Sequence, residues 1–182
     1  MTAARADRDE LLALLSQAPA EVLSTTAREN ITKWLSEPQF GDYYQETANH
    51  IREKKWAELN EAFWRVLEFG TGGRRGRMYP IGCNAINDRT IGESAQGLAN
   101  YVLGLADRPA ELSCAIAYDS RHRSRHFAEL CASILVAAGF RIVFLDGVRS
   151  TPELSFAVRY RKCTCGIMVT ASHNPPSDNA VK

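Results

Sequence analysis

The sequence predicts a doubly wound α/β domain with a largely parallel sheet, preceded by an N-terminal helical extension. Up to about residue 70, apolar residues recur only at the three- and four-residue spacing of amphipathic helices. Beyond that point, short apolar runs alternate with amphipathic segments in the order strand, helix, strand, helix, strand, which is typical of parallel sheets covered by helices. We therefore expect a helical extension over residues 1–69 and an α/β domain over residues 70–182.

Composition and charge exclude several classes of protein. With 182 residues, 45% of them hydrophobic and 24% charged, the chain is long enough to bury a core and is not of disordered composition. A net charge of +1 gives no global basic field, so we expect neither nucleic acid nor a membrane surface as a partner. The chain starts with charged residues where a signal peptide is apolar, and its five cysteines are an odd number. We therefore expect a cytoplasmic protein with reduced thiols.

The helical extension is predicted from three segments. A run of leucines between residues 11 and 15 forms the first apolar patch. Thr26 and Glu29 have the spacing of a capping box and predict the start of a second helix, which ends before Pro38. A third helix is predicted to continue through Phe69, with an aromatic stripe that serves as a packing face. Its apolar positions are Trp56, Leu59, Phe63 and Leu67.

The α/β domain is predicted from three apolar runs and the helices between them. The predicted buried strands are residues 114–118, 141–145 and 166–170. Thr90 with Glu93 is a second capping-box candidate and predicts the start of a helix before the first strand. Another helix is predicted from about Ser124 to a C-terminal glycine cap at Gly139, and a last one starts near Pro152.

A polar loop follows the third predicted strand. Residues 169–182 read VTASHNPPSDNAVK, and ligands of such sheets bind beyond the carboxyl ends of the strands. Ser172, His173 and Asn174 are therefore candidate functional residues, with an ordinary surface turn as the alternative. Serine beside histidine also suggests a hydrolase nucleophile. Sequence neighbours rarely form a triad, however, and no G-x-S-x-G motif surrounds Ser172.

A second candidate site is the segment of residues 69–78, FGTGGRRGRM. Its glycines offer exposed backbone N–H groups and its three arginines offer guanidinium groups, both of which suit phosphate oxygens. The segment lacks the Gly-Lys-Ser/Thr ending of a P-loop, and it follows a predicted helix where a dinucleotide-binding motif follows a strand. We predict a phosphate ligand here, with a flexible basic linker as the alternative.

Two pairs of residues could suggest a metal site, and neither is favoured. Cys163 and Cys165 do not have the spacing of a zinc knuckle, and no second cysteine pair completes four ligands. His122 and His126 would share one face of a helix, but the three arginines between residues 121 and 125 would repel a cation. We interpret the histidine pair as part of a solvated helix start.

Taken together, these motifs resemble the α-D-phosphohexomutase superfamily, which includes the phosphoglucomutases and phosphomannomutases. TASHNPP at residues 170–176 is similar to the family's phosphoserine loop, and FGTGGRRG at 69–76 is similar to its G-T-x-G-x-R-G element. AYDSRHRS at 117–124 and STPEL at 150–154 occur in the expected order between them. The leading helices and INDRTIGESAQGLANY at 86–101 resemble the phosphoglucomutase-2 or phosphopentomutase-type subgroup.

The resemblance implies a three-layer α/β/α domain with a mixed, mostly parallel sheet, the first of four domains. We therefore expect this chain to be the N-terminal fragment of a longer enzyme. It also implies that Ser172 carries a phosphoryl group and passes it to a hydroxyl of a sugar phosphate, giving a bisphosphate that returns its other phosphate to the serine. The phosphate would move between the 1- and 6-positions, or the 1- and 5-positions, of a glucose, mannose or pentose phosphate.

Further site residues follow from the same resemblance. Arg75 would bind the phosphoserine, and Lys182 would act as a general acid or base with His173 assisting. The other residues expected to bind phosphate or substrate are Thr71, Gly72, Arg74 and Asn174. Mg²⁺ would contact the phosphate on Ser172, but the family's Asp-Gly-Asp-Gly-Asp metal loop does not occur in this sequence.

The sequence departs from the family pattern in two places, and two other functions stay open. Asn179-Ala180 replaces the usual Asn-Gly before Lys182, and Gly73-Arg74 replaces Gly-Leu. We expect an intramolecular phosphotransferase activated by a sugar bisphosphate, with the 182-residue chain inactive alone and prone to self-association. The alternatives are a non-catalytic sugar-phosphate-binding module and an interaction fragment whose helices contact a partner.

Overall fold

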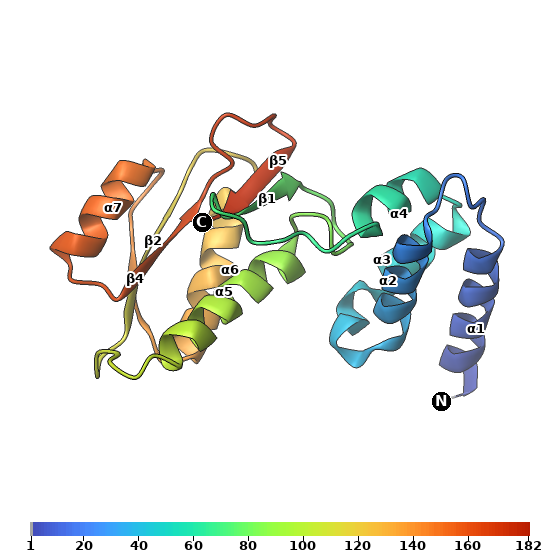
Figure 1. Ribbon diagram of the computed structural model, residues 1–182, viewed down its shortest axis with the longest axis horizontal. Helices are drawn as coiled ribbons and strands as arrows, with labels where there is room; N and C mark the ends of the chain where they lie inside the picture. The colour runs from blue at the N-terminus through green and yellow to red at the C-terminus, as the bar shows by residue number, and fades with distance from the viewer. Residues whose placement is uncertain (1) are drawn as a thin grey trace. The chain divides into compact units, whose positions relative to one another are not determined.

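The computed structural model describes residues 2–182 (Figure 1). The chain forms two compact units, of which the first extends to Leu67 and includes Tyr79–Asn87, and the second consists of Glu68–Met78 and Asp88–Lys182. The sequence placed residues 79–87 in the α/β domain. They pack with the helices instead, because Ile81 is fully buried in the helical core and Gly82 lies against the backbone of Ala62.

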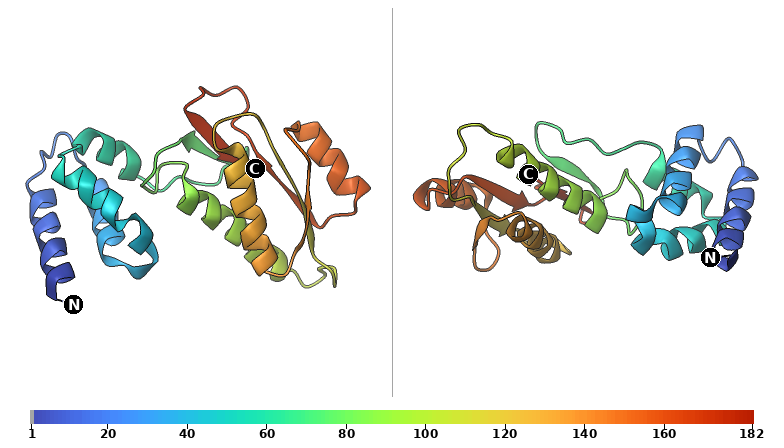
Figure 2. Two further views of the ribbon diagram at one scale, coloured as in Figure 1. Left: turned by 180° about the vertical axis from the view of Figure 1, so that it is seen from behind. Right: turned by 90° about the horizontal axis from the view of Figure 1, so that it is seen from below.

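The helical unit packs around a single apolar core. Its elements are α1 (Thr2–Ser16), α2 (Thr25–Ser36), the 3₁₀ helix η1 (Pro38–Tyr43), α3 (Tyr44–Arg52) and α4 (Trp56–Phe63). Helices α1 to α4 contact one another as a small bundle (Figure 2). At its centre Trp34 stacks on Phe40 with ring centroids 4.8 Å apart and meets Phe63 edge-on at 5.1 Å. None of the helices between residues 2 and 182 combines the length and apolar character that crossing a membrane requires.

Two predictions for this unit are wrong in detail. The α2 cap is Ser24 and not Thr26, since the Ser24 hydroxyl accepts a hydrogen bond from the Ala27 amide at 3.3 Å. Helix α4 ends at Phe63 and does not continue to residue 69. Beyond this point the backbone bonds to a distant segment, with the Leu67 amide donating to the Cys83 carbonyl at 2.8 Å. A tertiary hydrogen bond therefore replaces the helical one that the apolar spacing suggested.

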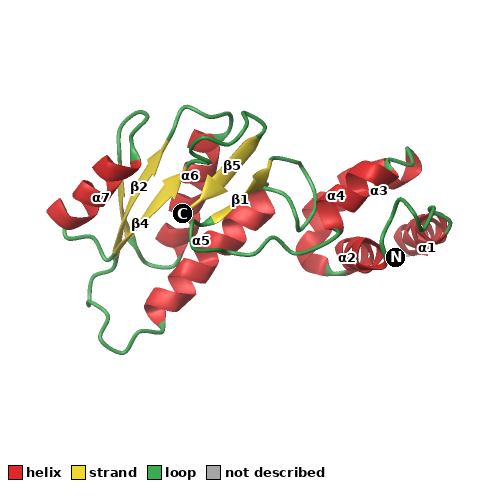
Figure 3. Ribbon diagram, turned by 45° about the horizontal axis from the view of Figure 1, so that its top comes forward, coloured by secondary structure: helices red, strands yellow, loops and turns green. Residues whose placement is uncertain are grey.

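The α/β unit is a five-stranded mixed sheet between two layers of helices. Its elements are β1 (Arg74–Arg77), α5 (Asp88–Leu103), β2 (Ser113–Tyr118), α6 (Ser124–Ala137), β3 (Arg141–Phe144), α7 (Thr151–Tyr160), β4 (Cys165–Val169) and β5 (Asp178–Val181). The strand order is β1-β5-β4-β2-β3; β2 runs parallel to β3 and β4, and β5 runs antiparallel to β4 and β1. Helix α7 covers β2 and β4 on one face, and α6, against which α5 packs, covers the other (Figure 3). The predicted three-layer α/β/α fold is confirmed.

Strands β1 and β5 were not predicted, and two other elements differ from the prediction. Both missed strands have only four residues: β1 is three arginines and a glycine, and the two apolar residues of β5, Ala180 and Val181, are too few to show a strand pattern. Strand β3 is an edge strand and is not buried, with Phe144 37% exposed. Helix α5 begins at Asp88, so the Thr90–Glu93 pair lies inside its first turn and does not cap it.

Gly73 lies where β1 approaches the end of β5. Its φ is +93°, and a Cβ added there would lie 2.3 Å from the Val181 carbonyl oxygen and 2.7 Å from Lys182 Cγ. Only glycine permits both the left-handed conformation and this close approach. Gly73 thereby lies directly against Lys182, which is 109 residues away in sequence.

We predict that Gly73→Ala destabilises the α/β unit by about 1–3 kcal/mol, because the left-handed backbone becomes strained and the methyl group collides with β5. Gly97→Ala is the matched control: Gly97 is an exposed position within α5 with no atom near its would-be Cβ, and alanine there stabilises by about 0.5–1 kcal/mol. Urea denaturation followed by circular dichroism measures both. Equal stability of Gly73→Ala and wild type would contradict the packing described here.

Candidate active site

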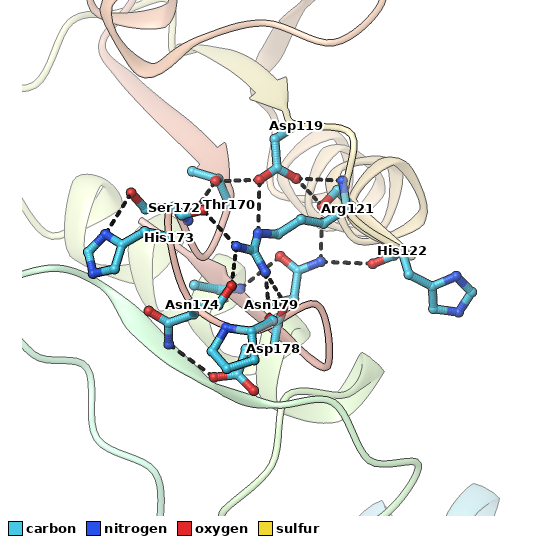
Figure 4. A network of polar contacts seen from close by, with 12 residues as sticks. Asp119, Arg121, His122, Thr170, Ser172, His173, Asn174, Asp178 and Asn179 are labelled. Atoms are coloured by element: carbon cyan, nitrogen blue, oxygen red, sulfur yellow. Dashed lines mark hydrogen bonds and ion pairs between the residues drawn. The ribbon is translucent and has the colours of Figure 1, made fainter.

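Asp119 joins the carboxyl ends of two neighbouring parallel strands. It directly follows β2, and its Oδ2 accepts a hydrogen bond from the hydroxyl of Thr170, which directly follows β4. Its Oδ1 accepts from the Ser124 hydroxyl at 2.6 Å, at the first residue of α6. Asp119 also forms an ion pair with Arg121, whose Nε lies 3.4 Å from Oδ2 (Figure 4). A single carboxylate therefore connects β2, β4 and α6 at the edge of the sheet where ligands of such folds bind.

Ser172 is exposed at this edge and its backbone is held on both sides. The amide of Ser172 donates to Thr170 Oγ1 at 2.9 Å, and its carbonyl accepts from Arg121 at 2.6 Å. Its φ is +56°, a left-handed conformation that is uncommon for residues with a Cβ. The Ser172 hydroxyl lies 3.4 Å from His173 Nδ1, and both side chains point away from Arg121 (Figure 4). The surrounding contacts thus fix the backbone while the hydroxyl stays open to solvent.

Arg121 binds the loop that carries Ser172, which we call the serine loop (residues 171–178). Its guanidinium donates four hydrogen bonds of 2.6–3.1 Å to backbone carbonyls of this loop. The acceptors are the carbonyl oxygens of Ser172, Asn174, Pro175 and Asp178. The side chain is only 14% exposed. The sequence analysis treated Arg121 only as one of three arginines around a solvated histidine pair, whereas the serine loop covers most of its guanidinium.

The serine loop is also closed by its own side chains. Asn174 Nδ2 donates to Asp178 Oδ2 at 3.0 Å, and the Asn174 amide donates to the Ala171 carbonyl at 3.1 Å. At the start of β5, buried Asn179 donates from Nδ2 to Ser124 Oγ at 3.0 Å. The side-chain amide of Asn174, expected to bind substrate, is therefore engaged within the loop.

The register of the sheet brings Arg75 and Lys182 to one face. Arg75 pairs with Ala180 across β1 and β5, and the Thr170 amide donates to the Ala180 carbonyl at 3.1 Å. Directly paired residues point to the same side of a sheet, so Arg75, Ala180 and Thr170 form one row. The Lys182 backbone pairs with Met168 at 2.9 and 3.0 Å, which puts Lys182 on this same face, two residues from Ala180. Exposed Arg75 and half-buried Lys182 thus share a sheet face with Thr170, the residue directly before the serine loop.

Arg74, which was expected to bind phosphate or substrate, points to the opposite face of the sheet from Arg75. It is 6% exposed, and its Nη1 donates to the Thr90 carbonyl at 2.8 Å and to Glu93 Oε2 at 3.0 Å. Successive residues of a strand alternate between faces, so Arg74 must turn toward α5 if Arg75 faces solvent. Thr71 and Gly72 are exposed in the turn before β1. The flexible-linker alternative is wrong, because this segment continues into a strand paired with β5.

The residues present do not form a magnesium site by themselves. Mg²⁺ requires near-octahedral oxygen ligands, and Asp119, which lies at the same sheet edge, is already bound to Thr170, Ser124 and Arg121. Between residues 2 and 182, no group of three or more His, Cys, Asp or Glu side chains is placed to hold a metal ion. His126, one of the two paired histidines, bonds through Nε2 to Asp88 at 2.8 Å.

The cysteines are free thiols in the structure. Cys165 is the first residue of β4, and Cys163 lies just before it. Burial raises the pKa of the Cys131 thiol to about 12. This thiol therefore stays protonated and unreactive at neutral pH.

Sequence reasoning missed three residues of the site: Asp119, Arg121 and Thr170. A signal was available for the first two, because a D-x-R sequence directly follows the predicted strand of residues 114–118. The carboxyl ends of neighbouring parallel strands lie at one edge of the sheet, so polar residues that follow one strand are expected close to those that follow its neighbour. The pairing of each side chain with its partner some 50 residues away required the structure.

The fold and the site define a class of protein, namely an α/β domain that presents an exposed serine and a basic strand face at the carboxyl edge of its sheet. Backbone N–H groups, arginine and lysine are the groups that bind phosphate oxygens. Residues 66–182 match the family model described as phosphoglucomutase/phosphomannomutase, alpha/beta/alpha domain I, and the chain belongs to this family.

Relatives and a solved structure agree with this assignment. A phosphoglucomutase of Staphylococcus haemolyticus (strain JCSC1435) is 36% identical over 155 residues, which are 85% of this chain and 26% of the relative. One of Staphylococcus aureus (strain USA300) is 42% identical over 125 residues, 69% of this chain and 22% of the relative. A crystal structure from Thermus thermophilus, described as a phosphomannomutase, superposes with a TM-score of 0.57 at 32% identity, over 65% of this chain and 25% of that one. The chain thus spans about a quarter of the length of the relatives it matches.

We predict that the adjacent arginines differ in their contribution to stability. Arg74→Met removes two charge-assisted hydrogen bonds from a buried position and costs about 1–3 kcal/mol of unfolding free energy. Arg75→Met, at an exposed position, changes it by less than about 0.5 kcal/mol. Thermal and urea denaturation of the two variants test this, and equal losses would contradict the alternation described above.

Proposed function

We propose that this chain is the phosphoserine-bearing domain of a phosphosugar mutase. The observation that carries the proposal is the exposed Ser172, whose backbone is fixed by Thr170 and Arg121 beside the face that holds Arg75 and Lys182. Membership of the phosphoglucomutase/phosphomannomutase family supports the class of reaction. Phosphoryl transfer depends mainly on positioning and charge stabilisation, which a rigid loop with nearby cations can supply.

In the proposed reaction, phosphorylated Ser172 transfers its phosphoryl group to a free hydroxyl of a sugar monophosphate. The serine O–P bond breaks as the sugar O–P bond forms, and the hydroxyl proton leaves to a base. The resulting bisphosphate turns over and returns its other phosphate to Ser172. The phosphate moves between the 1- and 6-positions of a hexose or the 1- and 5-positions of a pentose.

The proposal assigns roles to the residues around Ser172. A phosphoserine carries close to two negative charges near neutral pH, and Arg75 offers a guanidinium to its oxygens. Lys182 exchanges the proton of the reacting sugar hydroxyl, and His173 assists. Thr71 and Gly72 contribute exposed groups of the turn before β1. Arg74 and the Asn174 side chain act structurally, because each is engaged within the fold.

The remaining parts of the proposal concern the whole protein. We propose a cytoplasmic enzyme of the phosphoglucomutase-2 or phosphopentomutase-type subgroup, activated by a sugar bisphosphate. For Mg²⁺ the proposal assigns to this chain only the phosphate on Ser172, because the residues that the structure describes supply no set of carboxylate ligands.

We predict that Ser172→Ala in the full-length protein lowers mutase activity to background, because the other loop hydroxyl, that of Ser177, bonds to Asp178 at 3.1 Å and lies at the far end of the loop. Ser177→Ala is the matched control and should retain wild-type activity. Intact-mass analysis of protein purified without phosphatase should show one phosphoryl group, mapped to Ser172. Near wild-type turnover by Ser172→Ala would refute the proposal, and absence of phosphoserine from an inactive wild type would favour a non-catalytic binding module.

We predict that the 182-residue chain expressed alone has no measurable mutase activity, even with Mg²⁺ and a sugar bisphosphate. Its described residues form no cluster of metal ligands, and the chain spans only about a quarter of its relatives' length, so we expect the groups that hold the metal and the non-reacting phosphate to lie in the rest of the protein. A coupled assay measures this, with sizing chromatography to detect self-association through exposed apolar residues such as Phe156 and Tyr160. Robust, Ser172-dependent isomerisation by a monomer would overturn the prediction.

A further inference from the structure

We propose that Arg121 is a positioning residue that holds the serine loop in the conformation needed for phosphoryl transfer, and that it does not itself bind phosphate. The part of this inference that concerns turnover rests on the proposed function. The part that concerns the conformation of the loop stands on geometry alone.

The first argument is the use of the donors of Arg121. A guanidinium has five N–H groups in a fixed plane. Four of them are directed at serine-loop carbonyls at 2.6–3.1 Å, and Nε faces Asp119. No donor is left for a phosphate oxygen, and the side chain lies on the side of the loop away from the Ser172 hydroxyl (Figure 4). Arg121 therefore acts on Ser172 only through the backbone.

The second argument is the direction that this contact gives to a neighbouring amide. In a trans peptide the N–H points opposite to the C=O of the same unit, and the described chain has no cis peptide bond. Because the Ser172 carbonyl points at Arg121, the N–H of His173 points away from it, toward the side of the Ser172 hydroxyl. In the described part of the chain this N–H has no hydrogen-bond partner. It is thus available to an oxygen of a phosphate carried on Ser172.

The third argument is the conformation of Ser172 itself. Its left-handed φ of +56° is disfavoured for a residue with a Cβ and persists only where the surroundings determine it. The contacts that do so are the Thr170 hydroxyl on its amide and Arg121 on its carbonyl. Both partners are in turn bound by Asp119. Loss of Arg121 would release the Ser172 carbonyl and allow the hydroxyl to leave its position.

Lysine cannot replace arginine in this role. An ammonium is a compact point charge with three donors, whereas the four carbonyls lie between Ser172 and Asp178 and are reached by a planar fork. Arg121→Lys keeps the charge opposite Asp119, so it removes mainly the multiple contacts. Arg125→Lys is the matched control, because Arg125 is a 72% exposed arginine of α6 that pairs with Glu129.

The test uses the full-length protein, with hydrogen exchange of the amides in residues 171–178 and steady-state kinetics as readouts. For Arg121→Lys we expect exchange in the loop to accelerate by about tenfold or more. We expect kcat per phosphorylated, folded molecule to fall by about 100-fold, the order that a misplaced reacting group costs, with KM within about threefold of wild type. Arg125→Lys should match wild type in both readouts.

The outcomes separate this inference from the proposed function. Exchange in residues 171–178 that equals the control overturns the inference, and so does an unchanged kcat per folded molecule. If the wild-type protein lacks mutase activity, the proposed function fails and the exchange data alone decide whether Arg121 holds the loop. If Arg121→Lys does not fold, Arg121→Gln takes its place, since its amide offers two N–H donors and cannot contact all four carbonyls. Faster exchange localised to residues 171–178 then supports the inference, and exchange unchanged there overturns it.

Discussion

The carboxylate of Asp119 is the group on which the rest of the site depends. It accepts hydrogen bonds from Thr170 at the end of β4 and Ser124 at the start of α6, and it pairs with Arg121. An ionised carboxylate only accepts, so each neighbour must be a donor, and two hydroxyls and a guanidinium meet this requirement. Partly buried charge is costly unless it is paired and hydrogen-bonded, which explains why the group occurs as a complete network rather than alone.

The contacts around Asp119 also determine the conformation of the serine loop, through Arg121 and Thr170. Most of the loop has no regular secondary structure that would fix its shape, and the proposed function requires the Ser172 hydroxyl to keep a constant direction. Backbone carbonyls that would otherwise point to solvent converge on Arg121, and β5 then returns antiparallel to β4 with the Thr170 amide bonded to the Ala180 carbonyl. The Arg121 guanidinium, which the loop largely covers, and the pairing of β4 with β5 at the base of the loop therefore make the loop rigid. The exposed side chains of Ser172 and His173 are free of any structural task.

The sequence was informative where apolar patterns determine structure and uninformative where polar pairing does. Residues 114–118 and 166–170 were predicted as strands because burial on both faces requires apolar runs, and Ser172 followed from its place after the second of them. Strands β1 and β5 are too short to show such a pattern: β5 pairs with β4, and β1 has its backbone partners in β5, about 100 residues away. The position of Arg121 depends on backbone carbonyls that lie 51 to 57 residues away in sequence. Every residue type has a backbone carbonyl, so the sequence does not indicate which ones bind Arg121.

Three arginines show why residue type alone does not assign a role. Arg74 and Arg75 are sequence neighbours, but the pleat of β1 turns the buried Arg74 toward Thr90 and Glu93 of α5 and leaves Arg75 facing solvent. The Arg121 side chain is only 14% exposed, and its guanidinium contacts four backbone carbonyls and the Asp119 carboxylate. Counting guanidinium groups near the serine therefore overstates the charge available to a phosphate. Under the proposed function, Arg74 and Arg121 hold the backbone in place, and exposed Arg75, with Lys182 and the unpaired His173 amide, contacts the ligand. Geometry and charge neutralisation thus come from different side chains, so each can be altered by mutation without directly removing the other.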